Sequence, residues 1–234
     1  MFSMEMKCLA IIPARGGSKR IPRKNILLLE EKPLIVYSIE HARKSKLVSR
    51  IIVTTDDDEI ADISIKHGVE VIKRPIKIAD DTATSEDALI HTLNYLEEKE
   101  EYRPDIVVFL QCTSPLRNDD DIDNAIKMFL EQKADSLFSA VRFDKYIWRV
   151  MNNVVSPINY DYNKRWREQD FPPQYQENGS IYILKPELLK KHKNRLSGKI
   201  VIYEMDDMTF IQIDSHKDIE LFKYISKKFK KRGD

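Results

Sequence analysis

Several features that mark other protein classes are scarce in this sequence of 234 residues. It contains only two cysteines, Cys8 and Cys112, and both lie in apolar runs, so we expect buried, reduced thiols and no disulfide framework or metal cluster. Its 39 Lys and Arg residues nearly balance its 38 Asp and Glu residues, which leaves a formal net charge of +1. No overall charge therefore draws the chain to nucleic acid or to a membrane surface, and a site for an anion must be local.

Long apolar segments are missing as well. No apolar run approaches the roughly 20 residues that a helix needs to cross a bilayer. The amino-terminal stretch MFSMEMK lacks the apolar centre of a signal peptide. We therefore expect a cytoplasmic protein, with enough residues to bury a sizeable core as one α/β domain with an added lobe.

The first 140 residues alternate between two hydrophobic patterns. Short runs rich in Ile and Val, typical of buried parallel strands, occur at residues 8–13, 50–55, 69–74, 105–111 and 135–141. Amphipathic stretches with helical spacing separate them, at residues 33–46, 57–68, 85–101 and 120–133. Pro33 suits a first helical turn and Gly68 suits a helix end. The alternation predicts a mostly parallel sheet with helices on both faces, which is a three-layer α/β domain.

The alternation stops after Val141. Residues 142–178 are irregular, charged and rich in aromatic side chains, and we interpret them as an inserted lobe rather than as disorder. Strand patterns return at residues 179–185 and 199–205, and a helix is expected at residues 216–231. The sequence thus predicts a core made of two segments, residues 1–141 and 179–234.

The first strand pattern leads into a basic loop that contains two adjacent glycines. The loop in CLAIIPARGGSKRIPRKN carries five cationic side chains, namely Arg15, Lys19, Arg20, Arg23 and Lys24. Ligands of open α/β sheets bind at the carboxyl ends of the strands, and we expect Gly16 and Gly17 to adopt positive φ there and to form an anion nest. The stretch matches neither a Walker loop nor a dinucleotide fingerprint. We expect a polyanionic ligand such as a nucleoside triphosphate, and a solvated loop without a ligand is the alternative.

Stretches along nearly the whole chain resemble the acylneuraminate (sialic acid) cytidylyltransferase family. In chain order they read IIPARGGSKRIPRKNI, KPLIVYSIEHARKS, IIVTTDDDEIA, KRPIKIADDTATSEDAL, LQCTSPLR, QENGSIYILK and FIQIDSHKDIE. The resemblance implies a Rossmann-like nucleotidyltransferase domain that transfers CMP from CTP to the anomeric hydroxyl of an acidic sugar and releases pyrophosphate. It also implies a homodimer with the inserted lobe as the interface, whereas a monomer whose lobe folds back on itself is the alternative.

The resemblance assigns residues to the nucleotide. Arg15 and Lys24 would hold triphosphate oxygens and stabilise the charge that develops at the phosphorus. Gly16, Gly17 and Ser18 would add backbone and hydroxyl donors. The cytidine pocket would be lined by Ala14 (through its backbone), Asn25, Arg74 and Ser85. Two other interpretations stay open. Arg74 could be an ordinary strand-end cation, and Ser85 could be a helix N-cap.

The resemblance also assigns residues to the sugar. Gln111 follows a strand, where a glutamine is unsuited to fill a core because a buried amide needs hydrogen-bond partners. The implied sugar-binding residues outside the lobe are Gln111, Glu177 and Asn178. In the lobe they are Lys164, Arg165 and Arg167, any of which could bind the sugar carboxylate. Cys112 stands where the family usually has proline, and we expect no catalytic thiol because no strand-end histidine lies near it in the sequence.

Magnesium is the implied cofactor, and its site departs from the family pattern. The family has I-D-I-D, with both carboxylates on one side of a strand. Here IQID places Gln212 at the first position and Asp214 at the second. Asp214 is therefore the implied catalytic and metal-binding carboxylate, Gln212 can offer a neutral amide oxygen, and the number of ions stays open. Asp56 is a further acidic candidate, unless it caps the helix that starts near Asp57.

The expected substrates are CTP and a nine-carbon nonulosonic acid of the sialic, legionaminic or pseudaminic type. An eight-carbon ulosonic acid of the Kdo type is the enzymatic alternative. A nucleotide-binding protein without turnover is the alternative of another class, and Gln212 is the one feature that supports it.

Overall fold

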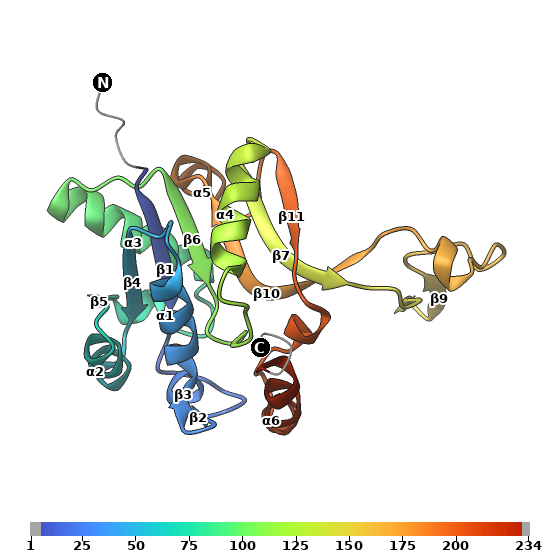
Figure 1. Ribbon diagram of the computed structural model, residues 1–234, viewed down its shortest axis with the longest axis horizontal. Helices are drawn as coiled ribbons and strands as arrows, with labels where there is room; N and C mark the ends of the chain where they lie inside the picture. The colour runs from blue at the N-terminus through green and yellow to red at the C-terminus, as the bar shows by residue number, and fades with distance from the viewer. Residues whose placement is uncertain (1–5, 231–234) are drawn as a thin grey trace.

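A computed structural model of the chain describes residues 6–230. Its centre is a seven-stranded sheet in the order β11-β7-β10-β6-β1-β4-β5 (Figure 1). The strands are β1 (Cys8–Pro13), β4 (Arg50–Thr55), β5 (Glu70–Lys73), β6 (Ile106–Leu110), β7 (Ser136–Arg142), β10 (Tyr175–Leu184) and β11 (Ile200–Glu204). Neighbouring strands are parallel except at β10, which is antiparallel to both β6 and β7. The predicted mostly parallel sheet is confirmed.

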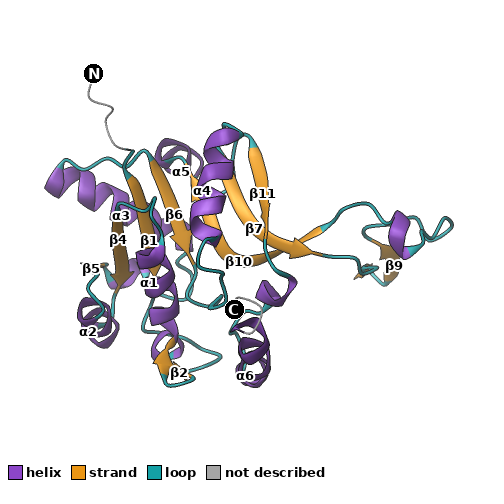
Figure 2. Cartoon of the chain, viewed as in Figure 1, coloured by secondary structure: helices purple, strands orange, loops and turns teal. Residues whose placement is uncertain are grey.

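Helices cover both faces of this sheet (Figure 2). They are α1 (Leu34–Lys44), α2 (Asp58–Lys66), α3 (Ser85–Glu100), α4 (Asp121–Glu131), α5 (Pro186–His192) and α6 (His216–Lys230). The side chains of β1 alternate between two apolar clusters. Ala10 and Ile12 share one cluster with residues of α1 and α4, whereas Leu9 and Ile11 share the other with α3. Because successive strand residues point to opposite faces, this alternation confirms the three-layer arrangement.

Short-range chemistry sets where the helices begin and end. The Asp57 side chain accepts a hydrogen bond of 3.0 Å from a backbone amide three residues later and so caps α2. Gly68 adopts φ +75° just after the end of α2, which confirms the predicted helix end. Thr84 caps α3 and forms a capping box with Asp87. The N-cap interpretation of Ser85 is therefore wrong, because this residue is the first one inside the helix.

An arm, defined here as residues 143–174, projects from the body of the molecule between β7 and β10 (Figure 1). Arg142 pairs with Tyr175 at its base, and a hairpin of β8 (Trp148–Met151) and β9 (Val154–Pro157) forms part of it. Aromatic rings consolidate the arm, since the Tyr146 ring centroid lies 4.3 Å from that of Tyr160 and 5.2 Å from that of Phe171. The sequence pattern does not predict the hairpin.

Smaller features complete the fold. A second short hairpin joins β2 (Leu28–Leu29) and β3 (Lys32–Pro33), and Pro33 occupies the cap position of α1 rather than its first turn. In residues 6–230, no helix is both long and apolar enough to cross a membrane. Most of the amino-terminal stretch inspected for a signal peptide, and the last residue of the helix expected at 216–231, lie outside the described residues.

Both thiols are buried and unpaired, as predicted. Burial raises the pKa of Cys8 and of Cys112 to about 12. Because the thiolate is the nucleophilic form, a protonated Cys112 at neutral pH does not act as a nucleophile.

Candidate active site

The loops that follow β1, β4, β5 and β6 meet at one edge of the sheet. Backbone hydrogen bonds hold the first three together, since Ala14 donates to the carbonyl of Thr54 at 3.0 Å and Arg74 donates to that of Thr55 at 2.9 Å. Gln111 directly follows β6 on the opposite side of β1 from β4. The strand order therefore collects most of the residues expected at the nucleotide, together with Gln111, at the carboxyl edge.

Of the two glycines after β1, Gly16 serves close packing, whereas a Cβ on Gly17 would have no neighbour within 4 Å. The amide of Gly16 donates to Asp56 Oδ1 at 3.1 Å, and a Cβ on Gly16 would lie only 2.5 Å from Asp57 Oδ2. Neither Gly16 nor Gly17 has positive φ, and the left-handed residue of this loop is Arg23, at φ +57°. The expectation of positive φ at both glycines was wrong, because the turn of the loop falls later in the chain.

Cations of this loop pair with groups that border the same edge. Arg15 donates to the carbonyl of Asp80 at 2.6 Å and lies 3.5 Å from the carboxylate of Asp81. Lys19 forms a 2.7 Å ion pair with Asp81, and Arg23 pairs with two carboxylates at the start of α2. Exposed pairs of this kind contribute little stability, so a polyphosphate can displace them readily.

Lys24 and Asp214 form the most enclosed cationic contact of the loop. Lys24 Nζ lies 2.8 Å from Asp214 Oδ1, and the lysine side chain is only 15% exposed. Asp218 holds the turn before α6, because its Oδ2 accepts hydrogen bonds from the amides of Asp214 and Ser215 at 2.9 and 2.6 Å. This turn brings the carboxylate expected at the metal to the basic loop.

The donor set for a divalent cation is small. Among residues 6–230, no cluster of three or more His, Cys, Asp or Glu side chains could hold a metal ion. Asp214 contributes one carboxylate, and Gln212 adds only a neutral amide. Magnesium often binds one or two carboxylates and takes its remaining ligands from substrate phosphates and water, so the residues present fit an ion that arrives with a nucleotide.

Arg74 is a buried cation that lacks a full set of partners. It is 8% exposed, and its Nε has no hydrogen-bond partner within the described residues. Its nearest carboxylate is that of Asp56, at 3.9 Å, and burial lowers the pKa of Arg74. An ordinary strand-end cation would be solvated, so the burial of this guanidinium favours a ligand as its missing acceptor. Asn25 is also buried and fixes the loop through a 2.9 Å hydrogen bond to the carbonyl of Arg15.

Two glutamine side chains meet at Gly179. A Cβ on this glycine would lie 2.6 Å from Gln111 Oε1 and 3.1 Å from Gln212 Oε1. Gly179 also has φ +64°, a conformation that residues with a side chain seldom adopt. The site thus has a cationic part formed after β1 and β5, and an amide-lined part formed after β6, at Gly179 of β10 and at Gln212 before α6.

Residues 9–231 match the family model for cytidylyltransferases. The chain belongs to the cytidylyltransferase family. It is 33% identical over 227 residues to the pseudaminic acid cytidylyltransferase of Campylobacter jejuni, covering 95% of this chain and 97% of that protein. It is also 33% identical over 223 residues to the N-acylneuraminate cytidylyltransferase of Escherichia coli, covering 93% of this chain and 52% of that protein. The expected family and enzyme class are confirmed.

Solved structures show the same fold at low sequence identity. A CMP:2-keto-3-deoxy-manno-octonic acid synthetase complexed with CTP has a TM-score of 0.71 and 18% identity, covering 95% of this chain and 99% of that one. A 4-diphosphocytidyl-2C-methyl-D-erythritol synthase also has a TM-score of 0.71, with 12% identity over 96% of this chain and 100% of that one. These similarities confirm the Rossmann-like nucleotidyltransferase architecture.

Asn178 of this cytidylyltransferase does not lie where the sequence placed it. Its side chain is fully buried, accepts a 2.6 Å hydrogen bond from Ser139 and donates a 3.0 Å hydrogen bond to Thr209. An amide enclosed in this way shapes the turn before Gly179 and cannot reach a sugar. Glu177 is exposed instead, and its carboxylate accepts a 2.8 Å hydrogen bond from the hydroxyl of Tyr182.

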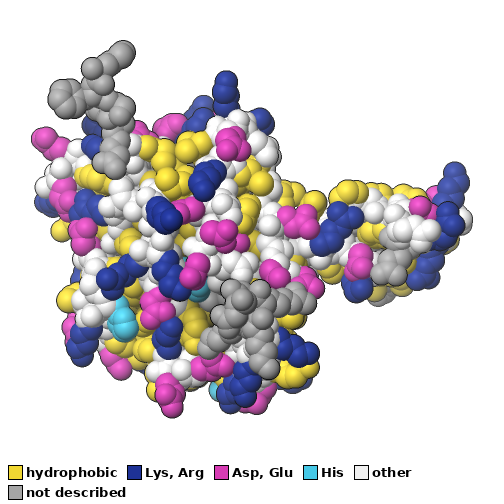
Figure 3. All heavy atoms as spheres, viewed as in Figure 1, with side chains coloured by type: hydrophobic (Ala, Val, Ile, Leu, Met, Phe, Trp, Pro, Cys, Tyr) yellow, Lys and Arg dark blue, Asp and Glu magenta, His cyan; other side chains and the backbone are white. Residues whose placement is uncertain are grey.

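The three cations expected at the sugar carboxylate lie on the arm, and all three are exposed. Arg165 stacks on the Tyr146 ring at 4.3 Å, and Arg167 forms a 2.9 Å ion pair with Asp170. The arm extends away from β1 and its loop (Figure 1), with Lys and Arg side chains at its outer end (Figure 3). A single chain of the cytidylyltransferase therefore does not bring Lys164, Arg165 and Arg167 to its own Gln111.

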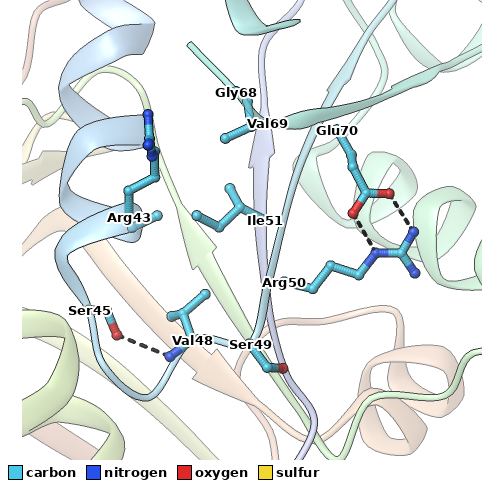
Figure 4. Close-up of a pocket in the computed structure, with 10 residues that line it drawn as sticks. Arg43, Ser45, Val48, Ser49, Arg50, Ile51, Gly68, Val69 and Glu70 are labelled. Atoms are coloured by element: carbon cyan, nitrogen blue, oxygen red, sulfur yellow. Dashed lines mark hydrogen bonds and ion pairs between the residues drawn. The ribbon is translucent and has the colours of Figure 1, made fainter.

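Two cavities of the cytidylyltransferase lie outside this site. One, of about 310 Å³, lies between the end of α1 and the starts of β4 and β5, at the opposite edge of the sheet (Figure 4). Its main charged groups satisfy each other, since Arg50 Nε donates to Glu70 Oε1 at 2.9 Å. The other, of about 700 Å³, lies between α1, α6 and residues 115–120, and the buried Arg117 forms part of its wall.

Proposed function

We propose that this cytidylyltransferase transfers CMP from CTP to the anomeric hydroxyl of an acidic nonulosonic sugar. The hydroxyl oxygen attacks the α-phosphorus, the bond to the departing pyrophosphate breaks, and the proton of the hydroxyl is released to solvent. The observation that carries the proposal is the pairing of a cationic part with an amide-lined part at one edge of the sheet. The names of the relatives, pseudaminic acid and N-acylneuraminate cytidylyltransferase, support a nine-carbon acidic sugar.

The cationic part binds the triphosphate. Arg15 and Lys24 exchange their present acceptors for phosphate oxygens, and Gly16, Gly17 and Ser18 add hydrogen-bond donors. The reaction gathers negative charge on the non-bridging oxygens and on pyrophosphate, so fixed cations lower its barrier. The ion pairs seen around the loop hold the Arg15 and Lys24 side chains close to the loop in the absence of a nucleotide.

The cytidine lies between the end of β5 and the start of α3. Arg74 supplies the buried donor whose acceptor is missing, and Ser85 supplies a hydroxyl on the first turn of α3. Asn25 and the backbone of Ala14 close the pocket from the side of β1. Since cytosine and uracil differ in a donor and an acceptor at one ring position, a pocket built from fixed polar groups separates CTP from UTP.

Asp214 would hold a magnesium ion, with Gln212 as a neutral neighbour. The bound ion would offset the negative charge of the phosphates during transfer. Lys24 pairs with the same carboxylate at 2.8 Å, so a bound cation would compete with the lysine for Asp214. Replacement of one family carboxylate by Gln212 favours a single metal ion.

The arm forms the interface of a homodimer and takes part in sugar binding. Its hairpin exposes large apolar side chains, including Val150 at 67% and Val154 at 63%, and exposed apolar groups of this extent mark interaction surfaces. A second copy would bring the cations of its arm, Lys164, Arg165 and Arg167, to the sugar carboxylate. The functional division proposed is therefore a CTP-binding core, residues 1–141 and 179–234, and a lobe, residues 142–178.

The test combines a substrate panel with a pair of neighbouring variants. Purified protein is incubated with CTP, Mg²⁺ and pseudaminic, legionaminic, N-acetylneuraminic or Kdo acid, and pyrophosphate is measured. We expect release with a nine-carbon acid and little with UTP. In calorimetry, Arg74→Met should weaken CTP binding, whereas Lys73→Met should not, because Lys73 pairs with Asp58 at the surface. Pyrophosphate release with Kdo alone would assign the eight-carbon sugar as the substrate. CTP binding without pyrophosphate release in the presence of any of these sugars would refute turnover.

A further inference from the structure

Arg117 is a buried cation whose hydrogen-bond acceptors carry no formal charge. It is 2% exposed and lies in the loop between β6 and α4. Its guanidinium donates to Ser38 Oγ at 3.2 Å, to the carbonyl of Gln111 at 3.1 Å and to the carbonyl of Ser180 at 2.8 Å. Burying a charge on neutral acceptors is costly, so a role beyond packing is expected for this side chain.

Two of the three acceptors, the carbonyls of Gln111 and Ser180, belong to the elements that form the amide-lined part of the site. Gln111 follows β6, Ser180 follows Gly179 in β10, and Ser38 lies on α1. Ser38 Oγ also lies 3.3 Å from the carbonyl of Gln111, so the hydroxyl and the guanidinium hold the same peptide group. A shift of this group would move the Gln111 side chain, whose Oε1 lies next to Gly179.

This part of the site lies on the side of the sheet from which the arm extends. In the strand order, β6 and β10 are adjacent, and β10 continues into the base of the arm, whereas β4 and β5 lie beyond β1. The residues expected at the triphosphate and the base follow β1 and β5 or begin α3. Arg117 therefore supports the amide-lined part of the site, which is the part that the nucleotide residues leave available for the sugar.

Charge adds a second reason for an arginine at this position. Arg117, Lys24 and Arg74 each oppose the rise in the pKa of the Cys112 thiol that burial causes, so all three cations are close enough to act electrostatically on this residue. Both proposed substrates are anions. The positive charge of Arg117, buried behind Gln111, attracts the two anionic substrates, and its side chain leaves the space in front of Gln111 free for them.

We propose that Arg117 is a positioning residue for the acidic sugar, which fixes the Gln111 side chain over the Gly179 turn. The inference rests on the proposed function, because it assigns the amide-lined part to the sugar. It predicts that changes at Arg117 alter the use of the sugar and leave the affinity for CTP unchanged. A purely structural arginine would instead affect folding and both substrates together.

The test compares Arg117→Lys and Ser38→Ala with the control Ser136→Ala. Lysine keeps the charge but cannot reach three acceptors at once. Ser136 is a fully buried serine at the amino end of β7, where its hydroxyl donates to the carbonyl of Ser197 at 2.8 Å. Each intact variant is assayed for kcat and KM of the sugar at saturating CTP, for the CTP dissociation constant by calorimetry, and for stability in urea.

The expected result is a split between the two substrates. Arg117→Lys lowers sugar kcat/KM by at least about tenfold, because small displacements of positioning groups are costly. Ser38→Ala lowers it about threefold, and Ser136→Ala lowers stability only. If Arg117→Lys fails to fold, the sugar kcat/KM and the CTP affinity of Ser38→Ala test the inference instead. Unchanged sugar kinetics in an active variant, or equal losses of CTP affinity and sugar kcat/KM, would overturn this inference. A wild-type protein without turnover would instead refute the proposed function.

Discussion

Replacement of Gly179 by alanine separates the backbone cost of this turn from its contribution to the site. Gly179 has φ +64°, and an L residue in this conformation costs about 1–2 kcal/mol. A chain of this size loses about 2–4 °C of melting temperature per kcal/mol, so the strain alone should lower Tm by about 2–8 °C. This part of the effect depends only on the backbone.

The second part depends on the neighbouring amides. The new Cβ would lie 2.6 Å from Gln111 Oε1 and 3.1 Å from Gln212 Oε1, both closer than ordinary van der Waals contact. Since both are the ends of flexible side chains, they can move away, and folding should survive. Gln111 must move farther, and a displacement of about 1 Å in a positioning group can reduce kcat/KM about a hundredfold.

Gly68→Ala is the matched control, because Gly68 has φ +75° at the end of α2, far along the chain from the amide-lined part. Its Cβ would meet nothing closer than Arg43 Nη1, at 3.7 Å. Both variants should therefore lose similar stability in urea. Only Gly179→Ala should lose activity toward the sugar, with CTP binding intact by calorimetry. Wild-type sugar kinetics in Gly179→Ala, or the same kinetic loss in Gly68→Ala, would refute this reasoning.

Three further predictions follow from single contacts. Asp81→Asn frees Lys19 and the Arg15 side chain and should tighten CTP binding by up to about fivefold in calorimetry; weaker binding would contradict the competition between carboxylate and phosphate. Lys24→Gln should lower kcat at least about a hundredfold at saturating substrates, and a change confined to KM would contradict its role in charge stabilisation. Burial lowers the pKa of His41 to about 4, so between about pH 6.5 and 4 only the unfolded chain takes up this proton and stability should fall by up to about 3 kcal/mol as the pH drops. His41→Gln should flatten that fall in urea titrations, and an unchanged slope would show that other groups cause it.

The core was predictable because its strands are buried on both faces. The runs at 8–13 and 50–55 coincide with β1 and β4 as the structure has them. Continuous β-branched segments of this kind leave little choice of partner or conformation. The loop after β1 was also predictable, because ligands of open α/β sheets bind at the carboxyl ends of the strands, whereas the carboxylate before α6 was expected only from the family resemblance.

The arm and the details of the site depend on contacts that the sequence does not encode locally. All four residues of β8 are exposed, so its sequence shows no alternation between a buried and an exposed face. Asn178 was placed at the sugar because the resemblance implies a role there for the residues before the strand, yet its side chain is fully buried. Arg117 was missed because its three acceptors come from different elements.

With Lys24 and Asp214 in the roles proposed above, their contact also constrains when the enzyme can become active during its synthesis. The two residues are 190 positions apart. A nascent chain can therefore display its basic loop, and can expose it to cellular nucleotides, long before the ribosome has added the carboxylate that completes the site. A chain released before that point would carry the basic loop, which attracts triphosphates, but would lack the Asp214 carboxylate that pairs with Lys24 in the complete fold.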